Sequence, residues 1–174
     1  MALATAFILS TVAALYNSTA NSVIDRQNVV IIGASSGIGR EMAMIYAARK
    51  LNLILVSRRK PLLDELVQKC NALGASATAF SADITNQTDM DDLAQFCLEN
   101  LGKCDTLVIS SGILSILPFA QVTSQVTRSL FETNTFGPIS AAKAFIPLIA
   151  SSKGRLVVIS SAAGVLAAPT VFCF

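Results

Sequence analysis

The sequence contains no histidine and no tryptophan, and only two of its 174 residues are tyrosine. Without histidine, Ser-His-Asp and Cys-His hydrolases, His-ligated zinc sites and histidine proton relays are excluded. Charged residues make up only 14% of the chain, and the net charge of +2 is spread along it, so we expect no nucleic-acid partner. The 53% hydrophobic content is too high for a disordered chain, and the low charge argues against a coiled coil. The length is enough for one domain with a real core.

Cysteine spacings typical of metal sites are also missing. The four cysteines form no CxxC motif and lie at Cys70, Cys97, Cys104 and Cys173. We therefore predict no metal site and expect reduced, mostly packed thiols, with a single stray pairing left open.

An apolar N-terminal segment covers residues 1–26. No charged side chain occurs before Asp25, and the run from Ala2 to Leu15 is almost entirely apolar. A membrane-spanning helix needs about 18 to 20 apolar residues, and this run is shorter and is preceded by no Lys or Arg. Two interpretations stay open. The segment is either a signal anchor or membrane-dipping helix, as at the endoplasmic reticulum membrane, or an N-terminal helix or disordered extension of a cytoplasmic protein.

Residues 27–174 are predicted to form a single domain in which strands alternate with helices. Five apolar runs predict strands at 29–32, 53–56, 77–80, 106–109 and 156–159. Helical patterns follow Gly37, run from Pro61 to about Gly74, begin at an Asn86 cap with Asp89 three residues on, and cover about Thr127 to Ser151. Continuous apolar strands separated by helices indicate a parallel sheet that is covered on both faces. We therefore predict an α/β, Rossmann-like, doubly wound fold.

A glycine-rich turn joins the first predicted strand to the first helix. It is Gly33-Ala34-Ser35-Ser36-Gly37-Ile38-Gly39. Small residues let the backbone turn sharply and approach a diphosphate, which the helix N-terminus would bind, while Gly39 would let the helix pack closely on the sheet. We predict Gly33, Ser35, Ser36, Gly37, Ile38 and Gly39 as cofactor-binding residues. The alternative is a tight turn without a ligand.

The end of the second predicted strand indicates which nicotinamide cofactor is preferred. An acidic residue there would bind the adenosine ribose 2′-OH and favour NAD. The chain has Ser57 at this place, followed by Arg58 and Arg59, either of which can pair with a 2′-phosphate. These residues predict NADP(H), unless the arginines are only a solvated pair. Asp83 would accept a hydrogen bond from the adenine amino group, unless it only flanks a helix start.

Several ordered motifs from Asn28 onward resemble those of the short-chain dehydrogenase/reductase family. The glycine turn is similar to its cofactor turn, and Ala82-Asp83-Ile84-Thr85 to its Asp segment. Ser110-Ser111-Gly112 stands in the place of its N-A-G motif. The resemblance adds Ile84, Ser110 and Gly112 to the cofactor-binding residues and implies an NADP(H)-dependent oxidoreductase that interconverts a carbonyl and a secondary alcohol.

The resemblance also implies two catalytic residues. Ser161, at the end of the fifth strand, matches the family's catalytic Ser better than its neighbour Ser160, because it directly precedes Ala-Ala-Gly. Asn134 matches the active-site Asn. Pro138, four residues later, has no N–H for the Asn134 carbonyl, so we expect a kink and a free carbonyl that can hold a water in a proton relay. The alternative is a surface Asn beside an incidental kink.

The family's Tyr-x-x-x-Lys pair has no counterpart at the expected place. The chain has only Tyr16 and Tyr46, and Tyr46 is followed by Lys50 but within the region of the first helix. We interpret the chain as an N-terminal portion with about five of seven strands, truncated before this motif, and expect an exposed apolar edge at the fifth strand. The chain alone is then predicted to be inactive.

Three hypotheses follow for the function. The first is the NADP(H)-dependent oxidoreductase, with a small-molecule carbonyl or alcohol substrate and a homodimer in its full-length form. The apolar run from Ile113 to Phe119 hints at a lipophilic substrate such as a steroid, retinoid or sphingoid ketone. The second is a non-catalytic NADP(H)-binding sensor or regulatory partner, and the third is an unfolded, non-functional product.

Overall fold

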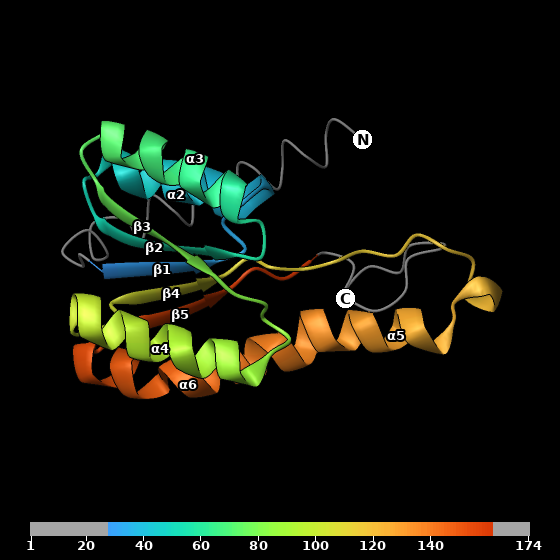
Figure 1. The fold of residues 1–174 in the computed structure, drawn as a ribbon. Coiled ribbons are helices and arrows are strands. Elements are labelled where there is room, and N and C mark those ends of the chain that lie inside the picture. Colours follow the sequence, from blue (N-terminus) through green and yellow to red (C-terminus); the bar gives the residue numbers. More distant parts are fainter. Residues whose placement is uncertain (1–27, 162–174) are drawn as a thin grey trace.

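The computed structural model describes residues 28–161. The predictions made for residues 1–26 and Cys173 lie outside this range. Within it, five parallel strands form one sheet in the order β3-β2-β1-β4-β5 (Figure 1). The strands are β1 (Asn28–Ile32), β2 (Asn52–Ser57), β3 (Ser76–Ser81), β4 (Thr106–Ile109) and β5 (Arg155–Val158).

Helices cover both faces of this sheet (Figure 1). One face bears α2 (Gly37–Ala48) and α3 (Lys60–Ala72), and the other bears α4 (Gln87–Leu101) and α6 (Gly137–Ser152). Alternate residues of β1 enter the two cores, Val29 on the α2 and α3 side and Val30 on the α4 and α6 side. A strand buried on both faces must be apolar throughout, so the doubly wound α/β prediction is confirmed.

The predicted long helical stretch is present and has three consecutive parts. It begins with α5 (Ser124–Phe131), which extends beyond the sheet in Figure 1, continues as the π-helical turn η2 (Glu132–Phe136), and ends with α6. The N–H of Gly137 donates to the carbonyl of Glu132, five residues earlier. The missing N–H of Pro138 is thus accommodated by a widened turn, and the predicted helical stretch from about Thr127 to Ser151 is present, with a π turn just before Pro138.

The amino-terminal end of the sheet is closed by buried polar side chains. The Asp105 carboxylate, just before β4, accepts the N–H of Asn28 at 3.1 Å and the Lys103 ammonium at 2.9 Å. The Asn28 amide donates to the carbonyls of Leu101 and Lys103, and its oxygen accepts from Asn52 at 2.9 Å. These contacts tie the starts of β1, β2 and β4 together.

Strand β5 lies at one edge of the described sheet, where an exposed apolar strand was predicted. Leu156 is 43% exposed and Val158 is 50% exposed. Their neighbours Val157 and Ile159 pack against the core on the α2 and α3 side. The alternation follows from having one face of the strand covered.

The predicted start of α4 is confirmed. The Asn86 side chain caps the helix by accepting the N–H of Thr88 at 3.0 Å. The Asp89 carboxylate, in the first turn of α4, accepts the N–H of Asp83 at 2.7 Å. Asp89 therefore holds the segment that carries Asp83.

Among the described residues, Cys70, Cys97 and Cys104 are free and buried, as predicted for them. The hydrogen bond that the Cys104 thiol donates to Cys97, and then burial, raise the pKa of Cys104 well above its usual range. Between residues 28 and 161, no helix combines the length and the hydropathy that a membrane crossing requires.

Candidate active site

A cavity of about 300 Å³ lies at the carboxyl ends of the strands, beside β1 and β4. The connections from β1 and β4 lead to helices on opposite faces of the sheet, and parallel α/β folds bind ligands where this reversal occurs. All the predicted cofactor residues except Gly39 line this cavity: Gly33, Ser35, Ser36, Gly37, Ile38, Ser57, Arg58, Arg59, Asp83, Ile84, Ser110 and Gly112.

The glycine turn has no room for side chains at two places. Gly33 has φ +92°, and a Cβ on it would lie 2.5 Å from the backbone nitrogen of Ser111. A Cβ on Gly39 would lie 2.4 Å from the carbonyl oxygen of Gly33. Gly39 thus lets α2 approach the turn itself, rather than the sheet as predicted, and it is buried instead of lining the cavity.

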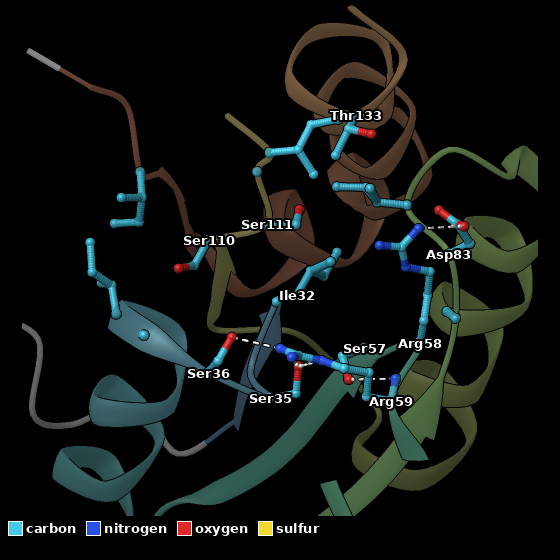
Figure 2. Close-up of a pocket in the computed structure, with 18 residues that line it drawn as sticks. Ile32, Ser35, Ser36, Ser57, Arg58, Arg59, Asp83, Ser110, Ser111 and Thr133 are labelled. Atoms are coloured by element: carbon cyan, nitrogen blue, oxygen red, sulfur yellow. Dashed lines mark hydrogen bonds and ion pairs between the residues drawn. The ribbon is translucent and has the colours of Figure 1, made fainter. Parts of the chain in front are cut away.

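Arg59 reaches from the end of β2 to the glycine turn (Figure 2). Its guanidinium donates to the Ser35 hydroxyl at 2.8 Å and to the Ser36 hydroxyl at 2.6 Å. The backbone N–H of Arg59 donates to Ser57 Oγ at 3.1 Å. No carboxylate takes part, so the arrangement keeps a full positive charge beside the turn.

Arg58 points the other way, toward Asp83 (Figure 2). Its guanidinium lies 3.4 Å from the Asp83 carboxylate, which also accepts the N–H and hydroxyl of Thr85. Burial raises the pKa of Asp83, but the hydrogen bonds from Thr85 and the charge of Arg58 outweigh it and hold that pKa below its usual range. Asp83 is therefore ionised at neutral pH and able to accept a hydrogen bond from a ligand.

A second cavity of about 370 Å³ contains the two predicted catalytic residues, Asn134 and Ser161, together with Ser160. The Asn134 side chain donates to the carbonyl of Ile113 and accepts its N–H, both at 2.9 Å. These bonds fix the segment after β4 against η2. The side-chain amide of Asn134 therefore has a structural role. That its main-chain carbonyl holds a relay water stays a prediction.

Sequence reasoning missed Ser111, which lines both cavities. Its hydroxyl oxygen is buried and has no hydrogen-bond partner. Thr133, Ile113 and Ile159 were also missed as lining residues. The only available signal for Ser111 was its place in the Ser-Ser-Gly motif, where the resembled family has Ala.

These residues fit a nicotinamide dinucleotide. The start of α2, where a Cβ on Gly37 would meet nothing within 4 Å, suits a diphosphate, and Arg59 suits a further phosphate. When bound, such a cofactor supplies or accepts a hydride. The chain's own residues would bind it, and the hydroxyl-bearing side chains of Ser160 and Ser161 line the adjoining cavity.

Comparison with known proteins agrees with this geometry. The profile of the family described as short chain dehydrogenase matches residues 27–174. A hydroxysteroid 11-beta-dehydrogenase 1-like protein of Gallus gallus is 35% identical over 144 residues, which are 81% of this chain and 50% of that protein. The 11-beta-hydroxysteroid dehydrogenase 1A of Arabidopsis thaliana is 33% identical over 81% of this chain and 41% of its own length.

A solved structure of a short chain dehydrogenase from Escherichia coli CFT073 superposes with a TM-score of 0.79 at 27% identity, covering 85% of this chain and 67% of the other. An alcohol dehydrogenase of Thermococcus sibiricus, complexed with 5-hydroxy-NADP, has the same fold, with a TM-score of 0.80 at 22% identity over 83% of this chain and 62% of its own. The chain spans about half the length of the curated relatives named here. The matched profile and the fold together show that this chain belongs to the short-chain dehydrogenase family.

Proposed function

We propose that this chain is the cofactor-binding part of an NADP(H)-dependent oxidoreductase that interconverts a carbonyl and a secondary alcohol. The observation that carries the proposal is the Arg59 guanidinium, held on the Ser35 and Ser36 hydroxyls at the end of β2. A 2′-phosphate there gains charge-assisted hydrogen bonds, and Ser57 offers no carboxylate to repel it. Arg58, whose side chain is 66% exposed, is free to swing from Asp83 toward the adenine.

Binding measurements on the purified chain test the cofactor preference. Arg59→Ala is expected to weaken NADPH binding by about tenfold to a hundredfold, because it removes charge-assisted hydrogen bonds, while NADH binding stays unchanged. Ser57→Asp is expected to reverse the preference toward NADH. Lys60→Ala is the matched control, since it removes a neighbouring positive charge that pairs with Asp64 outside the cavity. Equal affinity of the unaltered chain for NADPH and NADH would contradict the proposal.

The roles of Ser161 and Asn134 belong to the same proposal. Ser161 would polarise the substrate oxygen and the Asn134 carbonyl would hold a relay water, since both residues line the second cavity. Between residues 28 and 161 the single tyrosine is Tyr46, which lies in α2, and Lys50 lies beyond the end of that helix rather than within it. We therefore expect the 174-residue chain to bind NADPH without oxidising it in the presence of a ketone. Measurable oxidation would refute this expectation.

Binding without turnover would also suit the alternative, a non-catalytic NADP(H)-binding sensor. An open reading frame that continues into Tyr-x-x-x-Lys would favour the enzyme, and a genuine stop codon with tight NADPH binding would favour the sensor.

A lipophilic substrate is supported by the segment that follows β4. Leu114 is 55% exposed and Ile116 is 65% exposed, and Leu114 lines the second cavity. The relatives named as hydroxysteroid dehydrogenases add support for this substrate class. Thermal shift of the NADPH-bound chain with a steroid ketone and with a short-chain ketone tests it. We expect the steroid ketone to raise the melting temperature more.

Assembly and localisation complete the proposal. Phe136, Ile139 and Ile146 are each more than half exposed, which supports pairing of two copies through η2 and α6. Light scattering tests the dimer. Membrane association would reside in residues 1–26, and fractionation of the chain with and without that segment tests it.

A further inference from the structure

The Ser111 hydroxyl is the buried side-chain oxygen or nitrogen that the described part of the chain leaves without a partner. A buried hydroxyl without a hydrogen bond is destabilising, and the other buried polar side chains, such as Asn28 and Asp105, are bonded. A buried hydroxyl without a partner at the wall of a cavity is explained if a bound ligand supplies its hydrogen bond.

Ser111 lies where the two cavities meet. It lines both of them, together with Ser110, Gly112, Ile113 and Ile159. Its backbone packs against Gly33, the first residue of the diphosphate turn. In the view of Figure 2 its side chain lies between Ser110 and Thr133, across the pocket from Arg59. The hydroxyl therefore lies beyond the glycine turn, between Arg59 in the first cavity and the second cavity, which Ser161 lines.

The order of groups in a dinucleotide identifies what would lie there. If the 2′-phosphate is at Arg59 and the diphosphate is at the glycine turn, the next group is the second ribose, the one that bears nicotinamide. Its hydroxyls both donate and accept hydrogen bonds, as a serine hydroxyl does. Of the other residues that line both cavities, Gly112, Ile113 and Ile159 have no polar side chain. The hydroxyl of Ser110, unlike that of Ser111, is not among the buried groups that the described residues leave without a partner.

We propose that the Ser111 hydroxyl binds the nicotinamide ribose of the cofactor and so sets its position between the two cavities. The inference rests on the proposed function, because it assumes a bound NADP(H). It assigns to Ser111 a positioning role that the alanine of the resembled motif cannot perform.

Two ligands separate this role from that of Arg59. Titration calorimetry with NADPH and with 2′,5′-ADP, which has only the adenosine half, is carried out on the unaltered chain, Ser111→Ala and Arg59→Ala. Ser111→Ala is expected to raise the Kd for NADPH by about threefold to tenfold, as for one lost neutral hydrogen bond, and to leave 2′,5′-ADP within about twofold. Arg59→Ala is expected to weaken both ligands.

The matched control is Ser81→Ala, an exposed serine at the end of β3 that lines neither cavity. Thermal melting without ligand checks folding, and Ser111→Ala should melt no lower than the unaltered chain. Unchanged NADPH binding by Ser111→Ala, or an equal loss for both ligands, overturns the assignment to the nicotinamide ribose and leaves the proposed function intact. Failure of the unaltered chain to bind either ligand overturns both.

Discussion

Buried polar groups have hydrogen-bond partners at one end of the parallel sheet and lack one at the other. At the amino-terminal end, the Asp105 carboxylate and the Asn28 amide are buried and bonded to neighbouring backbone groups and to the side chains of Lys103 and Asn52. At the carboxyl end, the Ser111 hydroxyl is buried without a partner, and Gly33 has a positive φ. One end closes the fold, whereas the other leaves hydrogen-bonding capacity unused.

The difference shows where stability and binding are located in this chain. Engaged polar groups fix the register of β1, β2 and β4, and losing one leaves another buried group unpaired. An unengaged group at a cavity costs stability and is available to a ligand. Substitutions at the two ends should therefore differ in sign as well as in size.

The largest expected effect is at the closed end. Asp105→Ala leaves the buried N–H of Asn28 without an acceptor, and we expect a loss of about 2 to 4 kcal/mol in the free energy of unfolding. Denaturant titration measures it. Lys103→Ala is the control: its side chain is 52% exposed, so its ion pair with Asp105 is expected to contribute less than about 1 kcal/mol. Similar losses for the two variants would contradict the claim that the buried hydrogen bond from Asn28 to Asp105 stabilises this end of the sheet.

The next effect is at the glycine turn. Gly39→Ala places a methyl group 2.4 Å from a backbone oxygen, so α2 must shift, and we expect a net loss of about 1 to 2 kcal/mol together with weaker NADPH binding. Gly112→Ala should be tolerated in stability, because its Cβ would meet only the Asn134 amide oxygen, at 3.5 Å. If Gly39→Ala proved as stable as Gly112→Ala by thermal melting, the close approach would be unimportant.

A smaller effect of opposite sign is expected at the orphan hydroxyl. Ser111→Ala removes a buried polar atom that has no partner, so the nucleotide-free chain should gain up to about 1 kcal/mol. The comparison with Asp105→Ala, in the same denaturant series, is the direct test of the difference between the two ends. A loss of stability in Ser111→Ala would mean that its hydroxyl is engaged within the fold.

The smallest effect is the pH dependence at Asp83. Its pKa is held below the usual value, so its contribution to stability is present above the pKa of the unfolded chain and is lost as the pH falls through the folded-state pKa. Asp83→Asn should therefore flatten the acid side of the stability profile and leave its neutral side less stable by a small amount. Thermal melting between neutral and mildly acidic pH measures this. Asp91→Asn, in an exposed pair with Gln87, is the control.

Local pattern was sufficient for most of the fold. Apolar runs predicted all five described strands, because β1, β2 and β4 are almost wholly buried and the edge strands β3 and β5 are partly buried. Asn86 marked the start of α4 through its cap. The π-helical turn at Glu132–Phe136 was not predicted, because Pro138 only requires that a hydrogen bond be lost there. How the chain accommodates that loss depends on what packs around it.

The sequence by itself determined the element order, the glycine turn and the basic end of β2, since each depends on residues that are neighbours along the chain. Only the tertiary structure decided that Arg59 engages the turn while Arg58 engages Asp83, contacts between residues 24 and 25 positions apart. It also decided that Asn134 holds Ile113 and that the Ser111 hydroxyl is buried without a partner. Composition and spacing specify which groups are present, but burial and long-range packing determine which of them remain available to a ligand.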